Sequence, residues 1–268
     1  MTVSVCVAGA TGWTGRAVAQ AILESDDLQL RSAVSRSASG QDLGTAWGDE
    51  ANGVPVFERV GDALQGVQVL VDYTSHEAVR PNTLAAIEQG VSVVIGSSGL
   101  TAQDFADIDA AARSAGVGVV AAGNFSVTAA MAQAAALLVA RFLPNREIID
   151  YASDAKRDAP SGTANELAER LATVNATEVT VPVDQTGGRV EARGATVGGT
   201  QVHSVRLPSF VVSTEVVFAL PDERLSIRHD AGSTPAPYVF GTLLAIRAAS
   251  ERTGLVRGLD TLLLGVEE

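Results

Sequence analysis

A basic side chain and a small-residue turn stand close together in the segment 151–164, which reads YASDAKRDAPSGTA. Lys156 precedes a turn made of Ser161, Gly162 and Thr163, and a helical pattern follows. The first amides of a helix carry partial positive charge, and Lys156 adds a mobile ammonium group. The segment therefore predicts a pocket for a carboxylate or phosphate. A well-capped helix preceded by solvated charges would use the same residues.

The helix after this turn is predicted from its first residues. Residues 163–166 (TANE) have the Thr-x-x-Glu form of a capping box, and an apolar repeat continues after them. We therefore expect the helix to begin near Ala164.

Three glycines follow the first predicted strand. The motif G-x-x-G-x-x-G at 9–15 lies between the apolar run at 3–8 and a helical pattern. Glycines at this spacing let the backbone approach a pyrophosphate at a helix N-terminus. Ordinary tight turns also use glycine, but the strand–turn–helix context favours a dinucleotide site. The predicted turn contacts are Gly9, Gly12, Trp13, Thr14 and Gly15.

The type of cofactor is predicted from the end of the second strand. NAD sites usually carry Asp or Glu there, which binds the ribose 2′-hydroxyl group. This chain instead carries Ser35 and Arg36. Because an arginine accommodates a 2′-phosphate, the sequence favours NADPH. NADH stays an alternative, since Arg36 can equally be a surface charge.

Three further segments stand at the carboxyl ends of predicted strands, where open α/β sheets bind ligands. They are YT at 73–74, GSSG at 96–99 and AGNFS at 122–126. Small residues there let a nicotinamide and its ribose come close, although Gly and Ser also serve as ordinary turn residues. The predicted cofactor contacts are Tyr73, Thr74, Gly96, Ser97, Ser98, Ala122, Asn124 and Phe125.

The order of the predicted elements assigns the fold class, α/β. Apolar runs lie at 3–8, 28–34, 67–74, 91–99 and 116–126. They alternate with helical patterns, which indicates a Rossmann-like, doubly wound parallel sheet in the N-terminal part of the chain. We expect this part, residues 1–123 with the helical end at 233–268, to be the dinucleotide-binding domain.

A different pattern fills the middle of the chain. A long helix is expected at 128–142, and alternating segments lie at 177–183, 200–207, 213–220 and 224–230. Alternation with period two predicts an antiparallel or mixed sheet with one covered face. Residues 124–232 are therefore expected to form an α+β substrate-binding domain.

Composition excludes several classes of protein. The 268 residues are 46% apolar and 19% charged, which is typical of a globular chain. The net charge of −12 argues against nucleic acid or an anionic membrane as a partner, since either needs a basic face. The single cysteine, Cys6, allows no disulfide framework, and the three histidines lack metal-ligand spacing. Without a predicted membrane span or signal peptide, the expected location is cytoplasmic.

Five motifs occur in an order that resembles one known family. They are the glycine motif at 9–15, GSSG at 96–99, AGNFS at 122–126, KRDAPSGT at 156–163 and HSVRLP at 203–208. Over nearly the whole chain they resemble the dihydrodipicolinate reductase (4-hydroxy-tetrahydrodipicolinate reductase) family. The Lys-x-Asp-Ala-Pro-Ser-Gly-Thr block is the most specific of them.

The resemblance implies an activity and a set of contacts. It implies a cytoplasmic homotetramer, or a homodimer, of lysine and diaminopimelate biosynthesis that reduces a cyclic dicarboxylate, a small anionic substrate, with NADPH or NADH. The middle domain would then also carry oligomerisation. Substrate-binding residues would be Lys156, Ser161, Gly162 and Thr163, and residues lining the cofactor would be Gly9, Thr11, Gly12, Gly96, Ser98, Ala122 and Phe125.

The sequence also departs from the family pattern. The family normally carries a His-His pair just before the lysine, with the first histidine as proton donor, but Ala152 and Ser153 stand at those places. Alanine has no side-chain proton to give. An arginine that often follows near the end of the middle domain is also missing, and Thr234 is nearby instead.

Three interpretations stay open. The favoured one is an NAD(P)H-dependent reductase with an altered substrate, a cyclic imine or an unsaturated or keto acid bearing a carboxylate. The second is the authentic lysine-pathway reductase with a substitute donor, in which Asp154 or Tyr151 acts through water; losing the usual acid would slow it by roughly 10²–10⁴-fold. The third is a non-catalytic nucleotide-binding regulator. The candidate catalytic residues are Lys156 and Asp154; His229 would serve only if the fold brought it to the site.

Overall fold

The chain folds into two compact units. The computed structural model describes residues 2–265. Its first unit comprises the chain up to Val127 and again from Pro235 onward, and its second comprises Thr128–Thr234. The domain boundaries predicted from the sequence lie a few residues earlier at both junctions.

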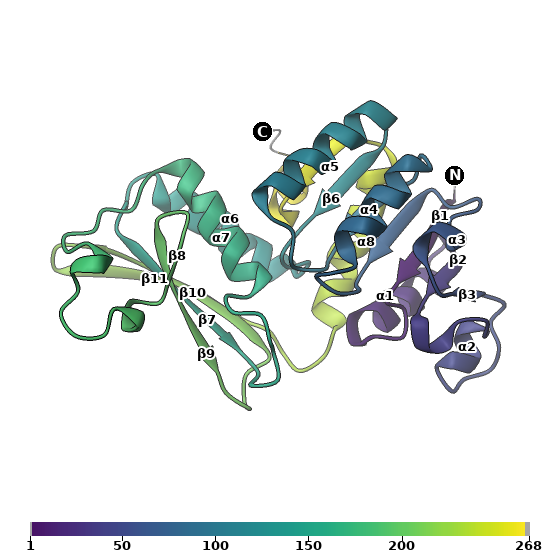
Figure 1. Ribbon diagram of the computed structural model, residues 1–268, viewed down its shortest axis with the longest axis horizontal. Coiled ribbons are helices and arrows are strands. Elements are labelled where there is room, and N and C mark those ends of the chain that lie inside the picture. The colour runs from purple at the N-terminus through teal and green to yellow at the C-terminus, as the bar shows by residue number, and fades with distance from the viewer. Residues whose placement is uncertain (1, 266–268) are drawn as a thin grey trace. The chain divides into compact units, whose positions relative to one another are not determined.

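A seven-stranded sheet forms the centre of the first unit (Figure 1). Its strands are β1 (Val3–Ala8), β2 (Leu28–Val34), β3 (Val56–Phe57), β4 (Val69–Asp72), β5 (Ser92–Ile95), β6 (Gly118–Ala121) and β12 (Gly254–Arg257). They lie in the order β12-β6-β5-β4-β1-β2-β3, and every neighbouring pair is parallel. The predicted Rossmann-like sheet is therefore confirmed. Its chain order reverses at β1, the point beyond which such sheets bind ligands.

Helices cover this sheet and bury its strands. They are α1 (Trp13–Leu23), α2 (Leu43–Ala46), α3 (Val60–Ala63), α4 (Val79–Glu88), α5 (Ala102–Ala115), α8 (Ala236–Ser250) and α9 (Leu259–Leu264), with a 3₁₀ turn at Arg36–Ala38. Every residue of β4, β5 and β6 is buried. Such burial explains why the strands read as unbroken apolar runs in the sequence. The short strands β3 and β12 give too little pattern to be predicted.

A five-stranded mixed sheet forms the second unit. Its strands are β7 (Arg146–Ala152), β8 (Ala195–Val197), β9 (Thr200–Arg206), β10 (Val212–Leu220) and β11 (Glu223–Asp230). They lie in the order β11-β10-β7-β9-β8, with β7 and β9 parallel and the other neighbours antiparallel. The predicted mixed sheet is confirmed.

Two helices, α6 (Val127–Ala140) and α7 (Gly162–Val174), cover one face of the mixed sheet (Figure 1). Along β7, burial alternates: Ile148, Asp150 and Ala152 are buried, whereas the residues between them are partly exposed. The buried core joins Ile148 to Leu171 of α7 and to Phe218 of β10. The second face has no such helical cover in the part of the chain that the structure describes.

Two local predictions were wrong. No strand forms at 177–183, where the chain is irregular and ends in a 3₁₀ turn at Val183–Gln185. Pro182 has no N–H to donate to a ladder, and Val179 and Val181 are exposed rather than buried. Helix α7 begins at Gly162 rather than near Ala164, because Ser161 and not Thr163 is its N-cap.

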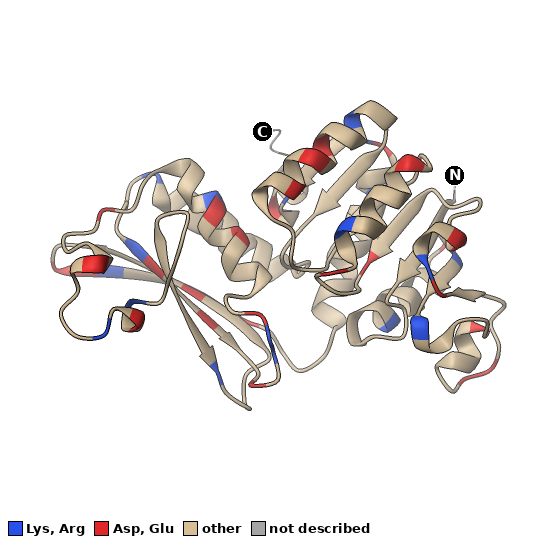
Figure 2. Ribbon diagram, viewed as in Figure 1, with Lys and Arg blue, Asp and Glu red and all other residues tan. Residues whose placement is uncertain are grey.

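Charges of both signs are mixed over the surface. Figure 2 shows Lys and Arg scattered among Asp and Glu, and acidic residues gather on α5. Within residues 2–265, no helix is long and apolar enough to cross a membrane, and no group of three His, Cys, Asp or Glu residues is arranged to hold a metal ion.

The core of the second unit gives a stability prediction. Leu171→Ala removes a fully buried side chain and is expected to lower the free energy of unfolding by roughly 2–5 kcal/mol. The matched control is Leu138→Ala on α6, where the side chain is 58% exposed and the expected change is within about 0.5 kcal/mol. Urea unfolding followed by circular dichroism measures both. Equal losses in the two variants would contradict the assigned core.

Candidate functional site

The glycine turn after β1 has a geometry that only glycine permits at two positions. Gly9 has φ +81°, and a Cβ on it would lie 2.3 Å from the carbonyl oxygen of Tyr73. A Cβ on Gly15 would lie 2.2 Å from the carbonyl oxygen of Gly9, because α1 packs directly on the turn. The Gly12 amide donates to the same carbonyl at 2.8 Å. The turn is therefore tight and leads straight into α1, as a pyrophosphate site requires.

No side chain caps the N-terminus of α1. Gly12 is the N-cap and has no side chain to occupy the first amides of the helix, and the first turn carries no acidic residue. Trp13 is 52% exposed, with its ring edge-to-face against Tyr238 at a centroid distance of 5.9 Å. Arg16 pairs with Asp49 at 3.0 Å. These features fit a dinucleotide whose pyrophosphate lies at the helix start.

The loop after β2 carries the residues predicted to choose the cofactor. Thr11 Oγ1 and Ser35 Oγ are 2.8 Å apart, which ties this loop to the glycine turn. Arg36 is exposed and begins a short 3₁₀ turn. The pKa of Glu77 is lowered, mainly by the Ser75 hydroxyl group and to a smaller extent by the Arg36 charge. Glu77, which sequence reasoning missed, therefore lies within electrostatic reach of Arg36.

A buried carboxylate at the end of β4 ties two of the predicted cofactor loops together. Asp72 is fully buried. It accepts hydrogen bonds from the Thr74 hydroxyl and amide at 2.7 and 3.0 Å, from the Ser97 hydroxyl at 2.7 Å and from the Asn82 side chain at 2.8 Å. A buried carboxylate needs such donors, and these come from the loops after β4 and β5 and from α4. Ser97 therefore points inward to Asp72.

Tyr73 packs against residues of the predicted cofactor loops after β5 and β6. Its hydroxyl lies 2.7 Å from Thr242 Oγ1, and because Thr242 already donates to the Tyr238 carbonyl, Tyr73 is the donor. Its ring meets Phe125 edge-to-face at 6.2 Å, and a Cβ on Gly96 would lie 2.2 Å from the ring. Burial raises the pKa of Tyr73 and keeps the hydroxyl protonated. The glycine at position 96 is thus required by the tyrosine.

The other predicted cofactor residues stand on the loops after β5 and β6. Ser98 is exposed, Ala122 is buried, and the Asn124 side chain accepts from the Ser126 amide at 2.8 Å just before α6. All the predicted cofactor residues therefore follow the carboxyl ends of β1, β2, β4, β5 and β6, at one edge of the first sheet. Their contact with a cofactor stays a prediction.

In the second unit, the predicted anion turn is held by hydrogen bonds from Ser161 to a buried carboxylate. Ser161 is buried and is the N-cap of α7, accepting from the Ala164 amide at 3.3 Å. Its hydroxyl and amide both donate to the buried carboxylate of Asp150, at 2.7 and 2.8 Å. Gly162 and Thr163 form the first helical turn. The Ser161 side chain therefore fixes the turn, and contact of Gly162 and Thr163 with a ligand stays a prediction.

Asp150 has a cationic partner that sequence reasoning did not identify. Arg206 donates to the Asp150 carboxylate at 2.8 Å and to the Asp158 carbonyl at 2.7 Å. Ser204 adds a hydrogen bond to Asp150 at 3.1 Å. Breaking a buried ion pair by removing one partner is strongly destabilising. The available signal was Asp150 itself, an acid placed among the buried positions of an alternating strand.

The charged residues before the turn are arranged in a loop. Lys156 pairs with Asp158 at 2.8 Å, and both side chains are about one-third exposed. Asp154 is exposed and accepts from the Ser153 hydroxyl at 3.2 Å. Ala152 is fully buried at the end of β7. Neither Lys156 nor Asp154 lines either of the two cavities beside the mixed sheet, and contact of either residue with a ligand stays a prediction.

Two cavities flank the mixed sheet. One, of about 20 Å³, lies on the helix-covered face and is lined by Thr163 and His229 among others. The other, of about 890 Å³, lies on the opposite face, where His203 is 2.8 Å from Glu147. The fold thus brings only one of these two histidines to the predicted anion turn.

Comparison with known proteins gives the same order of domains. A family model described as dihydrodipicolinate reductase, N-terminus, matches residues 3–125, and one described as its C-terminus matches residues 124–263. The 4-hydroxy-tetrahydrodipicolinate reductase of Moorella thermoacetica is 38% identical over 98% of both chains. That of Synechococcus elongatus is 37% identical over 97% of this chain and 98% of its own.

Solved structures extend the similarity. A dipicolinate-bound dihydrodipicolinate reductase from Paenisporosarcina sp. TG-14 superposes with a TM-score of 0.74 and 27% identity, over 97% of this chain and 99% of its own. An amine dehydrogenase from Mycobacterium smegmatis reaches a TM-score of 0.65 at 15% identity, over 96% of this chain and 95% of its own, and shares the fold alone.

The Asp72 network predicts a positioning role. Asp72→Asn turns part of the acceptor set into a donor that faces other donors, and we expect NADPH binding to weaken at least about tenfold, with a stability loss of about 1–3 kcal/mol. Fluorescence titration measures the affinity, and Asp62→Asn, in an exposed pair with Arg59, is the control. A folded Asp72→Asn protein with unchanged affinity would remove Asp72 from the cofactor site.

Proposed function

This chain belongs to the dihydrodipicolinate reductase family, and from that premise we propose that it reduces a small carboxylate-bearing cyclic imine, or an unsaturated or keto acid, with hydride from NAD(P)H. As a member of this family it is an NAD(P)H-dependent oxidoreductase with a Rossmann-like fold. The substrate and the proton donor are the parts of the proposal that need testing.

The observation that carries the proposal is the anchored turn at the start of α7. Asp150 fixes Ser161, so the amides of Gly162 and Thr163 are held in place before a ligand arrives. Lys156 supplies the positive charge. Preorganised amides and one cation bind a carboxylate strongly, because the protein has already met the cost of ordering them.

The first unit supplies the reducing group. When bound, the reduced nicotinamide supplies the hydride, and the protein supplies its placement. The glycine turn and the start of α1 would hold the pyrophosphate, with Thr11 beside it. Asp72 would keep the loops after β4 and β5 in position around the nicotinamide half.

A second candidate is the authentic lysine-pathway reaction. It is favoured by reductases of that name that are 35–38% identical over nearly their whole length. In that case Ala152 and Ser153, in place of the expected histidine pair, leave the proton to another group. The non-catalytic interpretation lacks such support.

Assembly and location also belong to the proposal. We expect a cytoplasmic homotetramer, with a homodimer as the alternative. The face of the mixed sheet that α6 and α7 leave uncovered supports this expectation, because Ile149, Val205 and Val217 line its large cavity and are only partly buried. A second copy would cover such a face.

The decisive assay is NADPH oxidation by the purified protein. The lysine-pathway substrate is generated in the cuvette and compared with other cyclic imines and unsaturated acids bearing a carboxylate. Lys156→Met is expected to raise KM for the active substrate at least about tenfold, whereas Arg157→Met, an exposed neighbour, leaves it unchanged. Efficient turnover of the lysine-pathway compound would establish the second candidate, and no turnover of any compound would reject the proposed function.

Cofactor preference depends on two opposite charges. Arg36→Ala is expected to raise KM for NADPH about 10- to 100-fold with little change for NADH, because only NADPH carries the 2′-phosphate. Glu77→Gln is the matched variant and should lower KM for NADPH, since it removes an acid near Arg36. Steady-state kinetics with both cofactors measures the two effects. Equal changes for NADPH and NADH would reject a 2′-phosphate site at Arg36.

A further inference from the structure

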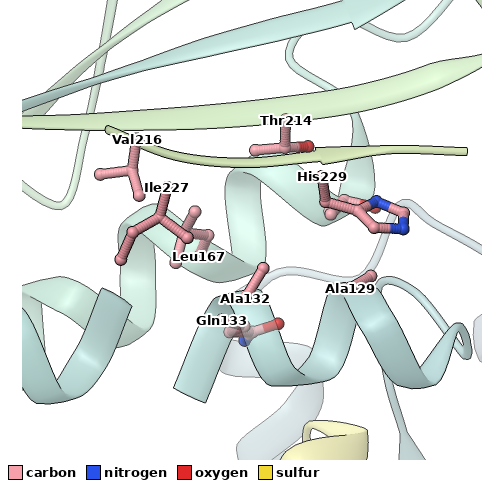
Figure 3. A pocket seen from close by; sticks show the side chains of 9 residues that line it. Ala129, Ala132, Gln133, Leu167, Thr214, Val216, Ile227 and His229 are labelled. Carbon is pink, nitrogen blue, oxygen red and sulfur yellow. The ribbon is translucent and has the colours of Figure 1, made fainter. Parts of the chain in front are cut away.

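The small cavity of the second unit has one apolar and one polar end. Figure 3 shows side chains of β10 and β11 facing α6, with Val216, Ile227 and Leu167 together at one end and Thr214 and His229 at the other. Gln133 of α6 and Thr163 of the anchored turn complete its polar lining.

An unpartnered hydroxyl group marks the polar end as a binding site. Thr214 is 8% exposed, and its buried Oγ1 has no hydrogen-bond partner. A buried polar group left unsatisfied costs about 1–3 kcal/mol. The cavity of about 20 Å³ is large enough for one water molecule or one ligand atom group. A water or a ligand oxygen is therefore expected to bind Thr214.

Strand register places His229 in line with the anchor of the turn. His229 pairs with Thr214, Thr214 pairs with Asp150, and Asp150 pairs with Ser204. Directly paired residues share a face, so these four side chains form a row on the face that α6 and α7 cover, with Ser204 exposed at its end. Asp150 holds Ser161, and His229 lies two strands away on the same face. The row thus runs from His229 to Asp150, which holds Ser161 of the anion turn.

Local contacts orient the imidazole. His229 Nε2 lies 3.0 Å from Thr128 Oγ1 at the start of α6. Burial lowers the pKa of His229, and the neighbouring Asp230 acts in the opposite direction. The other charged groups on the packed elements are Glu223, Arg224 and Arg228 on the same strand, Glu215 on β10, and Glu166, Glu169 and Arg170 on α7, whereas α6 carries none. A bound carboxylate would favour the imidazolium form.

We propose that His229 is the catalytic proton donor to the ligand held at Gly162 and Thr163, with Thr214 holding a water that fixes its position; this rests on the proposed function. In the reduced double bond, one atom receives the hydride from NAD(P)H, which becomes NAD(P)⁺. The other atom receives the proton from the His229 imidazolium, which becomes neutral and is protonated again by solvent.

Other groups near the turn are less suited to this role. Ala152 is buried and has no proton, and Ser153 is engaged within its own loop. Asp154 is exposed, and His203 lies on the opposite face of the sheet. Lys156 is paired with Asp158 and is proposed here to bind charge.

The kinetic test uses His229→Gln, which keeps a hydrogen-bonding side chain but cannot titrate. We expect kcat on the active substrate to fall roughly 100-fold or more, with KM for NADPH unchanged. In the natural protein kcat/KM should fall as pH rises through the His229 pKa, which lies below its ordinary value of 6.5, and this limb should vanish in the variant. The control is His76→Gln, whose ring is exposed and paired with Glu77, and it should behave as the natural protein. A His229→Gln enzyme of near-normal kcat overturns the proposal.

A second measurement decides the matter even if the proposed function fails. NMR follows the His229 ring in labelled protein during titration with dipicolinate, a dianionic probe. We expect its pKa to rise on binding, because the added carboxylate stabilises the imidazolium. His229 resonances that stay unmoved in up to about 10 mM dipicolinate would overturn the proposal. If they move but no substrate turns over, the site stands and the proposed reaction falls.

Discussion

The buried carboxylate of Asp150 ties the start of α7 to the mixed sheet of the second unit. It lies in the middle of the mixed sheet, on the face covered by α6 and α7, where an unpaired charge would be very costly. Arg206 from β9 neutralises it, and Ser161 uses both its hydroxyl and its amide to satisfy it. The consequence is that the start of α7 cannot shift without depriving a buried carboxylate of two hydrogen-bond donors. A turn fixed in this way is a better anion site than the same residues on a mobile loop.

The first unit also contains a buried carboxylate that holds loops in place. Asp72 is also fully buried, but it stands at the carboxyl end of a wholly buried strand and its partners are neutral donors on the neighbouring loops and α4. In both units a carboxylate inside the protein organises the edge where a ligand is expected. The chain carries a net charge of −12, yet neither of these acids faces an anionic ligand. The exposed acidic residues thus give the chain its negative charge, whereas these two buried acids hold loops and turns in place.

Much of the fold was visible in the sequence because parallel strands leave a strong pattern. The Rossmann-like sheet followed from unbroken apolar runs, and the tight turn followed from glycines that a Cβ at positions 9 and 15 would disrupt. Segment 177–183 failed because alternation alone does not show whether a partner strand exists, and Pro182 cannot join a ladder. The start of α7 was misplaced because Ser161 and Thr163 are both residue types that cap helices, and only Thr163 has a Glu three residues later. Only the position of Asp150 decides between them.

Side-chain pairing across the sheet is the part of the site that sequence could not supply. Residues 150, 204, 214 and 229 are far apart in the chain and share no motif. Register alone sets them side by side. In the proposed mechanism, the same register lets a chain without histidines at 152 and 153 present an imidazole to the ligand, because the helix-covered face can accept a titratable group from any strand that crosses it. A loss on β7 is therefore open to replacement from β11 without any change in the turn that is proposed to bind the carboxylate.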